Sequence, residues 1–144
     1  MTLLQQLKAD QLQARKNRDQ AKTAILTTLV AEVVSVGFND GKRATSDLEA
    51  ITVIKKFIKN VNEVIAASDG HNVSLYTYER DIYDSYIPNQ LSQDEIVAIA
   101  KQIISTIDDP SIKSLGFVMK VMKQNHAGLY DGKVASTVIR SLLA

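Results

Sequence analysis

The sequence predicts an all-α protein with an N-terminal four-helix domain followed by a small three-helix C-terminal domain. Two observations indicate this architecture. Apolar residues recur every three or four positions along most of the chain, which is the period of an amphipathic helix. Short stretches rich in Gly, Asn, Asp and Pro interrupt that pattern, as turns between helices do.

The first two helices are predicted by their apolar sides and by one cap. Apolar residues of the first are Leu3, Leu4, Leu7 and Ala14, and those of the second are Ala21, Ile25, Leu26, Leu29, Val30 and Val33. Asp19 is a suitable cap for the second helix. The β-branched run at 30–36 could be read as a strand, but no second strand exists for it to pair with. We therefore expect this run to be helical.

The third and fourth helices follow two predicted turns, at residues 37–46 and 68–72. Ser46 and Glu49 have the spacing of a capping box, in which each residue bonds the other's backbone N–H. The apolar stripe of the third helix is Ile51, Ile54, Ile58, Val61 and Ile65, and that of the fourth is Tyr76, Ile82, Tyr83, Tyr86 and Ile87. Pro88 cannot continue a helix, so the fourth is predicted to end there.

Pro88 also marks the predicted boundary between domains, at residues 1–87 and 88–144. Ser92 and Glu95 form a second capping box, which opens a helix over 92–107. Asp109 is predicted to cap the sixth helix with Pro110 at its first position, and the helix to cover 112–124. The last helix is predicted over 132–143, with Gly128 closing the sixth helix and Asp131 capping the seventh.

Composition restricts the class of protein. Hydrophobic residues make up 45% of the chain and charged residues 23%, which is typical of a folded soluble protein. The net charge of +1 is too small to indicate a nucleic-acid or membrane partner by itself. The chain has no cysteine, and its first residues are too charged for a signal peptide or a membrane span. We expect a cytoplasmic protein without a membrane partner.

Charged residues are distributed unevenly along the chain, although the net charge is small. Residues 1–87 carry 11 basic and 11 acidic side chains, whereas residues 92–110 carry one lysine and four acids. Residues 111–144 carry five cations against Asp131 alone. The C-terminal domain therefore has an acidic first helix and a basic second half.

The sixth helix is the first candidate for a nucleic-acid interface. Helical spacing places Lys113, Lys120 and Lys123 in one arc, with Phe117 at its margin, opposite an apolar side. Exposed rings that stack on bases beside cations that meet phosphates are typical of RNA binding. The alternative is that Phe117 packs on the fifth or seventh helix and the lysines are a solvated face. A second basic patch at 8–22 is explained as well by a solvated helix end.

No catalytic, metal-binding or cofactor-binding site is predicted. His71 and His126 both lie in turns, without the helical i,i+4 partner of a metal pair. The phosphate-binding glycine motifs and the Gly-x-Ser-x-Gly elbow are missing. Glu79, Arg80, Asp81 and Asp84 are interpreted as the polar side of the fourth helix.

Three motifs resemble those of the GatB/YqeY family. Its signature is a Tyr-hydrophobe-Pro-x-Gln-Leu-Ser run, then Gly-x-Val-Met, then Asp-Gly-Lys opening a last helix. The matching residues are Tyr86, Pro88, Gln90, Leu91 and Ser92, then Gly116, Val118 and Met119, then Asp131, Gly132, Lys133 and Val134, with Glu79 and Ile82 as the lead-in. The chain departs from the family at Phe117, where a small or charged residue is more usual, and in the second helix, which lacks a basic arginine.

The resemblance implies an all-α protein of two domains without catalytic activity of its own. In the amidotransferase that converts misacylated Glu-tRNA or Asp-tRNA, the similar module is the tail of the B subunit and helps to hold the tRNA. The implied partners are tRNA and the aminoacyl-tRNA or amidotransferase machinery. An autonomous amidotransferase or hydrolase is not expected, because no nucleophile or ATP site is visible.

Our leading hypothesis is therefore a non-catalytic module that binds tRNA or associates with a tRNA amidotransferase. The helix end at Gly132 is predicted to contact phosphates, together with the cations Lys113, Lys120, Lys123, Lys133 and Arg140. The ring of Phe117 is predicted to stack on a base. The alternative is a protein–protein adaptor that docks through the acidic helix 92–107 and the margin around Phe117, without RNA.

Overall fold

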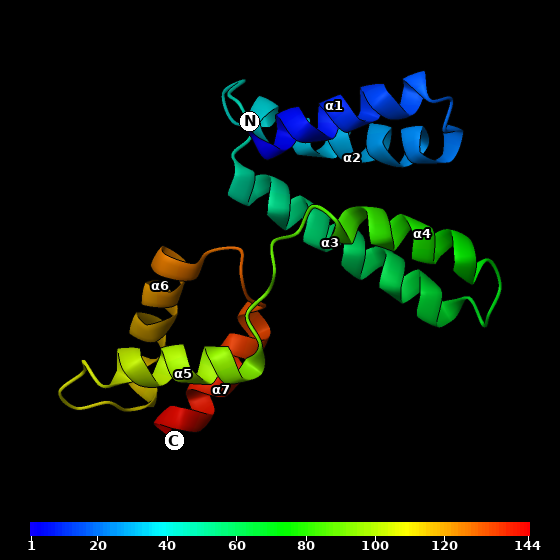
Figure 1. The fold of residues 1–144 in the computed structure, drawn as a ribbon. Helices are drawn as coiled ribbons and strands as arrows, with labels where there is room; N and C mark the ends of the chain where they lie inside the picture. Colours follow the sequence, from blue (N-terminus) through cyan, green and yellow to red (C-terminus); the bar gives the residue numbers. More distant parts are fainter. The chain divides into compact units, whose positions relative to one another are not determined.

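The structure, a computed structural model, describes residues 1–144 and consists of seven α-helices and one short 3-10 helix, without strands (Figure 1). The elements are α1 (Leu3–Lys16), α2 (Gln20–Asn39), α3 (Asp47–Ala67), α4 (Val73–Asp84), α5 (Gln93–Ile104), η1 (Ile112–Ser114), α6 (Leu115–His126) and α7 (Gly132–Leu143). The all-α prediction is confirmed. The chain forms two compact units, Met1–Ile87 and Pro88–Ala144, which we call the N-terminal and C-terminal units.

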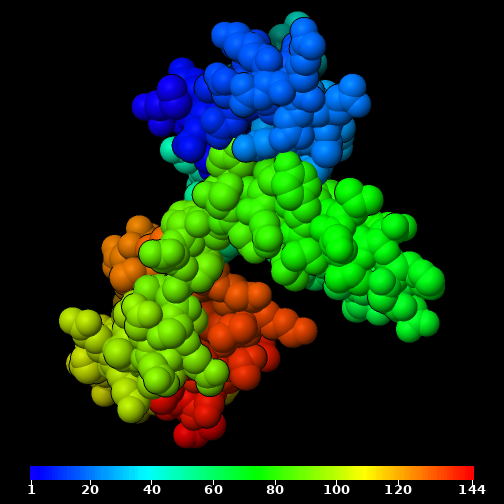
Figure 2. All heavy atoms as spheres, turned by 45° about the vertical axis from the view of Figure 1, so that its right-hand side comes forward, coloured from blue at the N-terminus to red at the C-terminus, as the bar shows by residue number.

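The N-terminal unit is built from two packed helix pairs. α1 packs on α2, and α3 lies beside α4, as Figures 1 and 2 show. Asp19 caps α2 as predicted, accepting a hydrogen bond from the Lys22 N–H at 3.1 Å. The run at 30–36 is helical, also as predicted. α1 begins with a capping box between Thr2 and Gln5, which the sequence analysis did not identify.

The α2–α3 connection differs from the prediction at its start. A loop was expected from residue 37, but α2 continues to Asn39. The Thr45 side chain, which is only 5% exposed, explains the difference. Its hydroxyl donates to the Val33 carbonyl at 2.6 Å and accepts from the Gly37 N–H at 3.0 Å. In a regular α-helix the Gly37 N–H would donate to the Val33 carbonyl. The Thr45 hydroxyl therefore lies against the last turns of α2 and bonds both of these backbone groups.

Gly37 makes this close approach possible. The Arg43 N–H donates to the Gly37 carbonyl at 3.0 Å. A Cβ atom at Gly37 would lie 2.3 Å from the Arg43 carbonyl oxygen and 2.8 Å from Ala44 and Thr45 backbone atoms. Only glycine therefore allows the returning chain to lie against α2.

The start of α3 is held by a charged capping box. Ser46 and Glu49 form the predicted box, with the Glu49 N–H donating to Ser46 Oγ at 3.2 Å. Arg43 adds two hydrogen bonds of 2.8 Å to the Glu49 carboxylate. Bonding by Arg43 first, and then by Ser46, lowers the pKa of Glu49 to about 2. The carboxylate therefore stays ionised at the helix N-terminus, where negative charge is favourable.

The core of the N-terminal unit takes one apolar side from each of its four helices. Its buried residues are Leu7, Leu26, Leu29, Val30, Val33, Ala50, Ile54, Val61, Ile82 and Tyr83. By length and composition alone α2 is long and apolar enough to cross a membrane, a weak indication because core helices of soluble proteins pass the same test. In this structure one side of α2 lies in the core, with Leu26, Leu29 and Val33 buried.

α4 ends earlier than predicted. It was expected to reach Ile87, but its last residue is Asp84. The Ser85 hydroxyl donates to the Ile82 carbonyl at 2.6 Å, and Pro88 disfavours helical geometry at Ile87. Tyr86 nevertheless packs against the core and donates its hydroxyl to Asp10 at 2.6 Å.

The C-terminal unit packs α5, α6 and α7 around a second core. Its buried residues are Ile96, Ala100, Val118, Met122, Ala135, Val138 and Ile139. The predicted Ser92–Glu95 capping box opens α5. α5 ends at Ile104 instead of residue 107, because the Ser105 and Thr106 hydroxyls bond the carbonyls of the preceding turn.

The predicted start of the sixth helix is wrong. Asp109 does not cap a helix and Pro110 does not open one. Ser111 has extended backbone geometry, with a φ of −145°, so no helix runs from Pro110 through this residue. Ser111 then caps η1, and α6 follows from Leu115. The Leu91 N–H donates to the Leu129 carbonyl at 2.7 Å, which ties the residues after Pro88 to the C-terminal unit.

Replacing Gly37 by alanine tests the close approach of the α2–α3 connection. Because the added Cβ meets backbone rather than a flexible side chain, we expect Gly37→Ala to lower the free energy of unfolding by about 2–4 kcal/mol. Gly116→Ala is the control, since a Cβ added at Gly116 would meet nothing within 4 Å. It should leave stability unchanged or raise it by up to about 1 kcal/mol. Urea unfolding followed by circular dichroism measures both. Equal stability of the two variants would contradict the assignment.

Two core truncations test whether each unit is a domain in the energetic sense. Leu29 and Met122 are fully buried in different units, so Leu29→Ala and Met122→Ala should each cost about 2–5 kcal/mol. If the units are domains, Leu29→Ala accelerates amide hydrogen exchange within residues 1–87 only, and Met122→Ala within 88–144 only. Acceleration throughout the chain by either variant would show one cooperative unit.

Candidate nucleic-acid interface

Four of the seven predicted site residues lie on η1 and α6. Val118 and Met122 are fully buried, so the residues on the other side of α6 face away from the core. Lys120 and Lys123 are exposed there, and Lys113 is exposed in η1. η1 packs against both α6 and α7.

Phe117 is the informative residue on this side. Its side chain is 51% exposed and is not among the residues packed against the C-terminal core. Phe117 is therefore not part of this core, and about half of its surface is open to solvent. Phe117 lies one helical turn before Lys120, so an accessible ring and a cation share one side of α6.

The other three predicted residues lie on α7. Asp131 caps this helix as predicted, with Oδ1 accepting from the N–H groups of Lys133 at 2.8 Å and Val134 at 3.4 Å. Gly132 is the first helical residue. Lys133 and Arg140 are exposed and seven residues apart, which places them on one side of α7, away from buried Ala135 and Ile139.

Asp131 changes what the start of α7 can bind. Two of the amides that a phosphate would use at a helix N-terminus already donate to its carboxylate. An anion would therefore be bound by the side-chain cations of α7 more readily than by the backbone N–H groups at the start of this helix.

The five candidate cations of this interface, out of six in the C-terminal unit, are in none of the ion pairs of the structure. All of them are exposed, and the ion pairs of the structure join Arg43 to Asp40 and Glu49, and Arg80 to Asp81. Among the acids of this unit, Asp131 caps α7 and Glu95 completes the capping box of α5. The cations on α6 and α7 are thus available to an external anion, on two helices that pack against each other.

The remaining candidates are not among the residues predicted for this interface. His71 is exposed in the turn after α3, and His126 is the half-buried last residue of α6. No group of three or more His, Cys, Asp or Glu side chains is arranged to hold a metal ion. The second basic patch, with Arg15, Lys16 and Arg18 exposed, lies at the end of α1.

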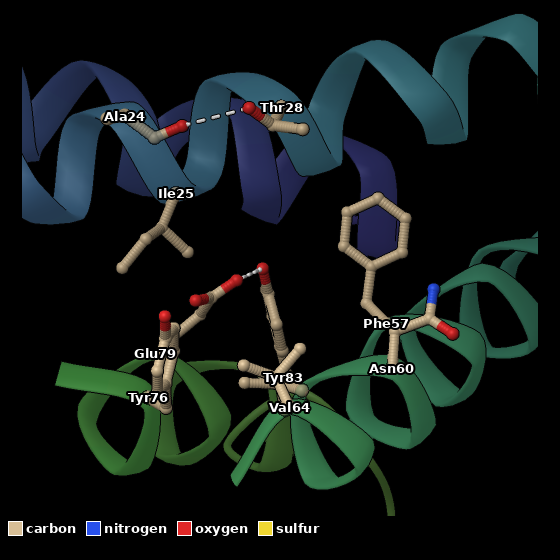
Figure 3. Close-up of a pocket in the computed structure, with 10 residues that line it drawn as sticks. Ala24, Ile25, Thr28, Phe57, Asn60, Val64, Tyr76, Glu79 and Tyr83 are labelled. Atoms are coloured by element: carbon tan, nitrogen blue, oxygen red, sulfur yellow. Dashed lines mark hydrogen bonds between the residues drawn. The ribbon is translucent and has the colours of Figure 1, made fainter. Parts of the chain in front are cut away.

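The environment of Glu79 differs from the prediction. Glu79 was assigned to the polar side of the fourth helix, but it is half-buried and accepts a hydrogen bond from the Tyr83 hydroxyl at 2.5 Å. Both side chains line a pocket of the N-terminal unit (Figure 3). Burial, and then Glu79, raise the pKa of Tyr83. The i,i+4 spacing of Glu79 and Tyr83 is the signal that could have indicated this contact.

Fold and site together define an all-helical protein with a compact C-terminal unit whose second half is basic. A protein-family model described as "Yqey-like protein" matches residues 4–143. The chain belongs to the YqeY-like family, and the resemblance stated from its motifs is confirmed. No curated protein matches the chain.

Replacing Asp131 tests the cap that orients α7. Asp131→Ala leaves two N–H groups without their side-chain acceptor and should lower stability by about 1 kcal/mol. Asp131→Asn is the matched control, because asparagine caps a helix about as well as aspartate. Urea unfolding of both variants measures the effect. If the alanine variant unfolded at the same urea concentration as the native chain, the prediction that this cap stabilises the protein would be contradicted.

Proposed function

We propose that this chain is a non-catalytic helical protein whose C-terminal unit binds tRNA. The observation that carries the proposal is the side of α6 on which the half-exposed ring of Phe117 lies beside unpaired Lys120. An accessible aromatic ring can stack on an unpaired base while neighbouring cations contact the phosphates.

The other cations extend this surface beyond one contact. Lys123 lies one turn after Lys120, Lys113 lies in η1, which packs against α6, and Lys133 and Arg140 add two charges on α7. If all five meet phosphates, the logarithm of the affinity should fall with the logarithm of salt concentration with a slope of about −4. Gly132 contributes only its own amide, since Asp131 occupies the next two.

Membership of the YqeY-like family supports a role beside the tRNA amidotransferase or aminoacyl-tRNA machinery, in the cytoplasm. In this proposal the chain holds RNA and chemistry is performed by its partners. The resemblance to the tail of the amidotransferase B subunit is a fold-level analogy, so binding has to be measured directly.

The second candidate is a protein–protein adaptor that docks through the acidic helix and the Phe117 margin. Exposed apolar side chains at Ile112, Phe117 and Val134 favour it, because such residues also occur in protein interfaces. Association with the amidotransferase machinery that survives nuclease treatment, together with absence of tRNA binding, would favour the adaptor.

A double charge reversal on α6 tests tRNA binding. We expect Lys120→Glu/Lys123→Glu to weaken tRNA binding by at least about tenfold at low salt, because two attractive phosphate contacts become repulsive. Lys56→Glu/Lys59→Glu is the matched control: it has the same spacing and the same charge change on α3 of the other unit. Fluorescence anisotropy with labelled tRNA measures both. The proposal fails if native protein binds no tRNA, or if both double variants lose affinity equally.

Phe117→Ala separates stacking from charge. It should weaken tRNA binding by about 1–3 kcal/mol without changing the salt dependence, because it removes a stacking surface and no cation. A changed salt slope with unchanged affinity would contradict this role.

A further inference from the structure

The N-terminal unit contains a pocket that the proposed function does not use. It has a volume of about 430 Å³ and lies among α2, α3 and α4 (Figure 3). Its lining is Ala24, Ile25, Thr28, Phe57, Asn60, Val61, Val64, Tyr76, Glu79 and Tyr83. Pockets for small molecules are commonly about 300–1,000 Å³, largely apolar, with a few polar groups that orient the ligand.

The walls of the pocket are aromatic and aliphatic. The rings of Phe57 and Tyr83 meet edge to face, with centroids 5.6 Å apart and planes at 84°. Figure 3 shows Ile25 of α2 extending toward Glu79 and Tyr83 of α4. Val64 is exposed at the rim, so the pocket is open to solvent. This lining fits the apolar body of a small organic molecule.

A single charged side chain lines this apolar space. Glu79 is half-buried, is in none of the structure's ion pairs, and is hydrogen-bonded by the Tyr83 hydroxyl at 2.5 Å. Tyr83 is only 2% exposed, so its ring is held by packing and orients the carboxylate. Arg80, the next residue, pairs with Asp81. Glu79 therefore supplies negative charge that no ion pair of this protein compensates.

We propose that this pocket binds a small organic cation, an ammonium group on an apolar body, with the ammonium at Glu79. A carboxylate beside aromatic rings favours a cation by direct charge attraction and by cation–π contact. An anionic ligand would be repelled, and a neutral one would desolvate the carboxylate without compensating it. This site is in a different unit from the RNA surface and does not depend on it.

The test uses the full chain and three probes of equal length: n-hexylammonium, 1-hexanol and hexanoate. Titrations followed by ¹⁵N-edited NMR should show hexylammonium shifting amide signals of α2, α3 and α4 around the lining residues. Hexylammonium should bind at least about fivefold more tightly than hexanol, and hexanoate should bind most weakly.

A pair of charge-neutralising variants tests Glu79 itself. Glu79→Gln keeps the size of the side chain and an acceptor for Tyr83, and should bind hexylammonium no better than hexanol. Glu63→Gln, the matched control, removes the same charge from an exposed position of α3 outside the pocket and should retain the preference.

Three results would each overturn the proposal. They are hexanol binding as tightly as hexylammonium, absence of shifts in the lining residues at millimolar probe, and a cation preference that survives in Glu79→Gln. Circular dichroism checks that the variants fold. The comparison of the three probes on the native chain needs no variant, so it decides the question even if Glu79→Gln is unstable.

Discussion

The insertion of the Thr45 hydroxyl between the Val33 carbonyl and the Gly37 N–H is the contact on which the N-terminal unit depends. It satisfies polar groups at the buried end of α2 and brings the returning chain onto Gly37, where any side chain would collide with backbone. The next residues are the Ser46–Glu49 capping box, so the direction of α3 follows from the same contact. The pocket at Glu79 exists because α3, oriented in this way, meets both α2 and α4.

The two proposed sites share one physical cause, which is charge left uncompensated after folding. In the C-terminal unit, Lys120 and the other candidate cations are in none of the ion pairs, and Asp131 is engaged as the cap of α7. In the N-terminal unit, Arg43 and Arg80 pair with other acids and leave Glu79 alone. Uncompensated charge beside aromatic side chains favours a charged ligand, an anion next to the exposed ring of Phe117 and a cation at Glu79.

Local sequence signals predicted the starts of helices better than their ends. The caps at Asp19, Ser46, Ser92 and Asp131 are all present, because each depends on a side chain and a backbone N–H within three residues. The ends of α4 and α5 were misplaced, since serine and threonine hydroxyls there bond the preceding turn although the apolar pattern continues. Before α6, Ser111 caps η1, whereas Asp109, which was predicted to cap the sixth helix, caps none.

By itself, the sequence determined the all-α class, seven helices and the basic second half of the C-terminal unit, because periodicity, caps and charge are local properties. The tertiary structure decided which side chains remain accessible. Phe117 is exposed because Val118 and Met122 complete the C-terminal core without it. Glu79 faces a pocket instead of open solvent because Tyr83 and Phe57, which are 26 positions apart, pack against each other. Such contacts depend on how helices meet, which no local pattern specifies.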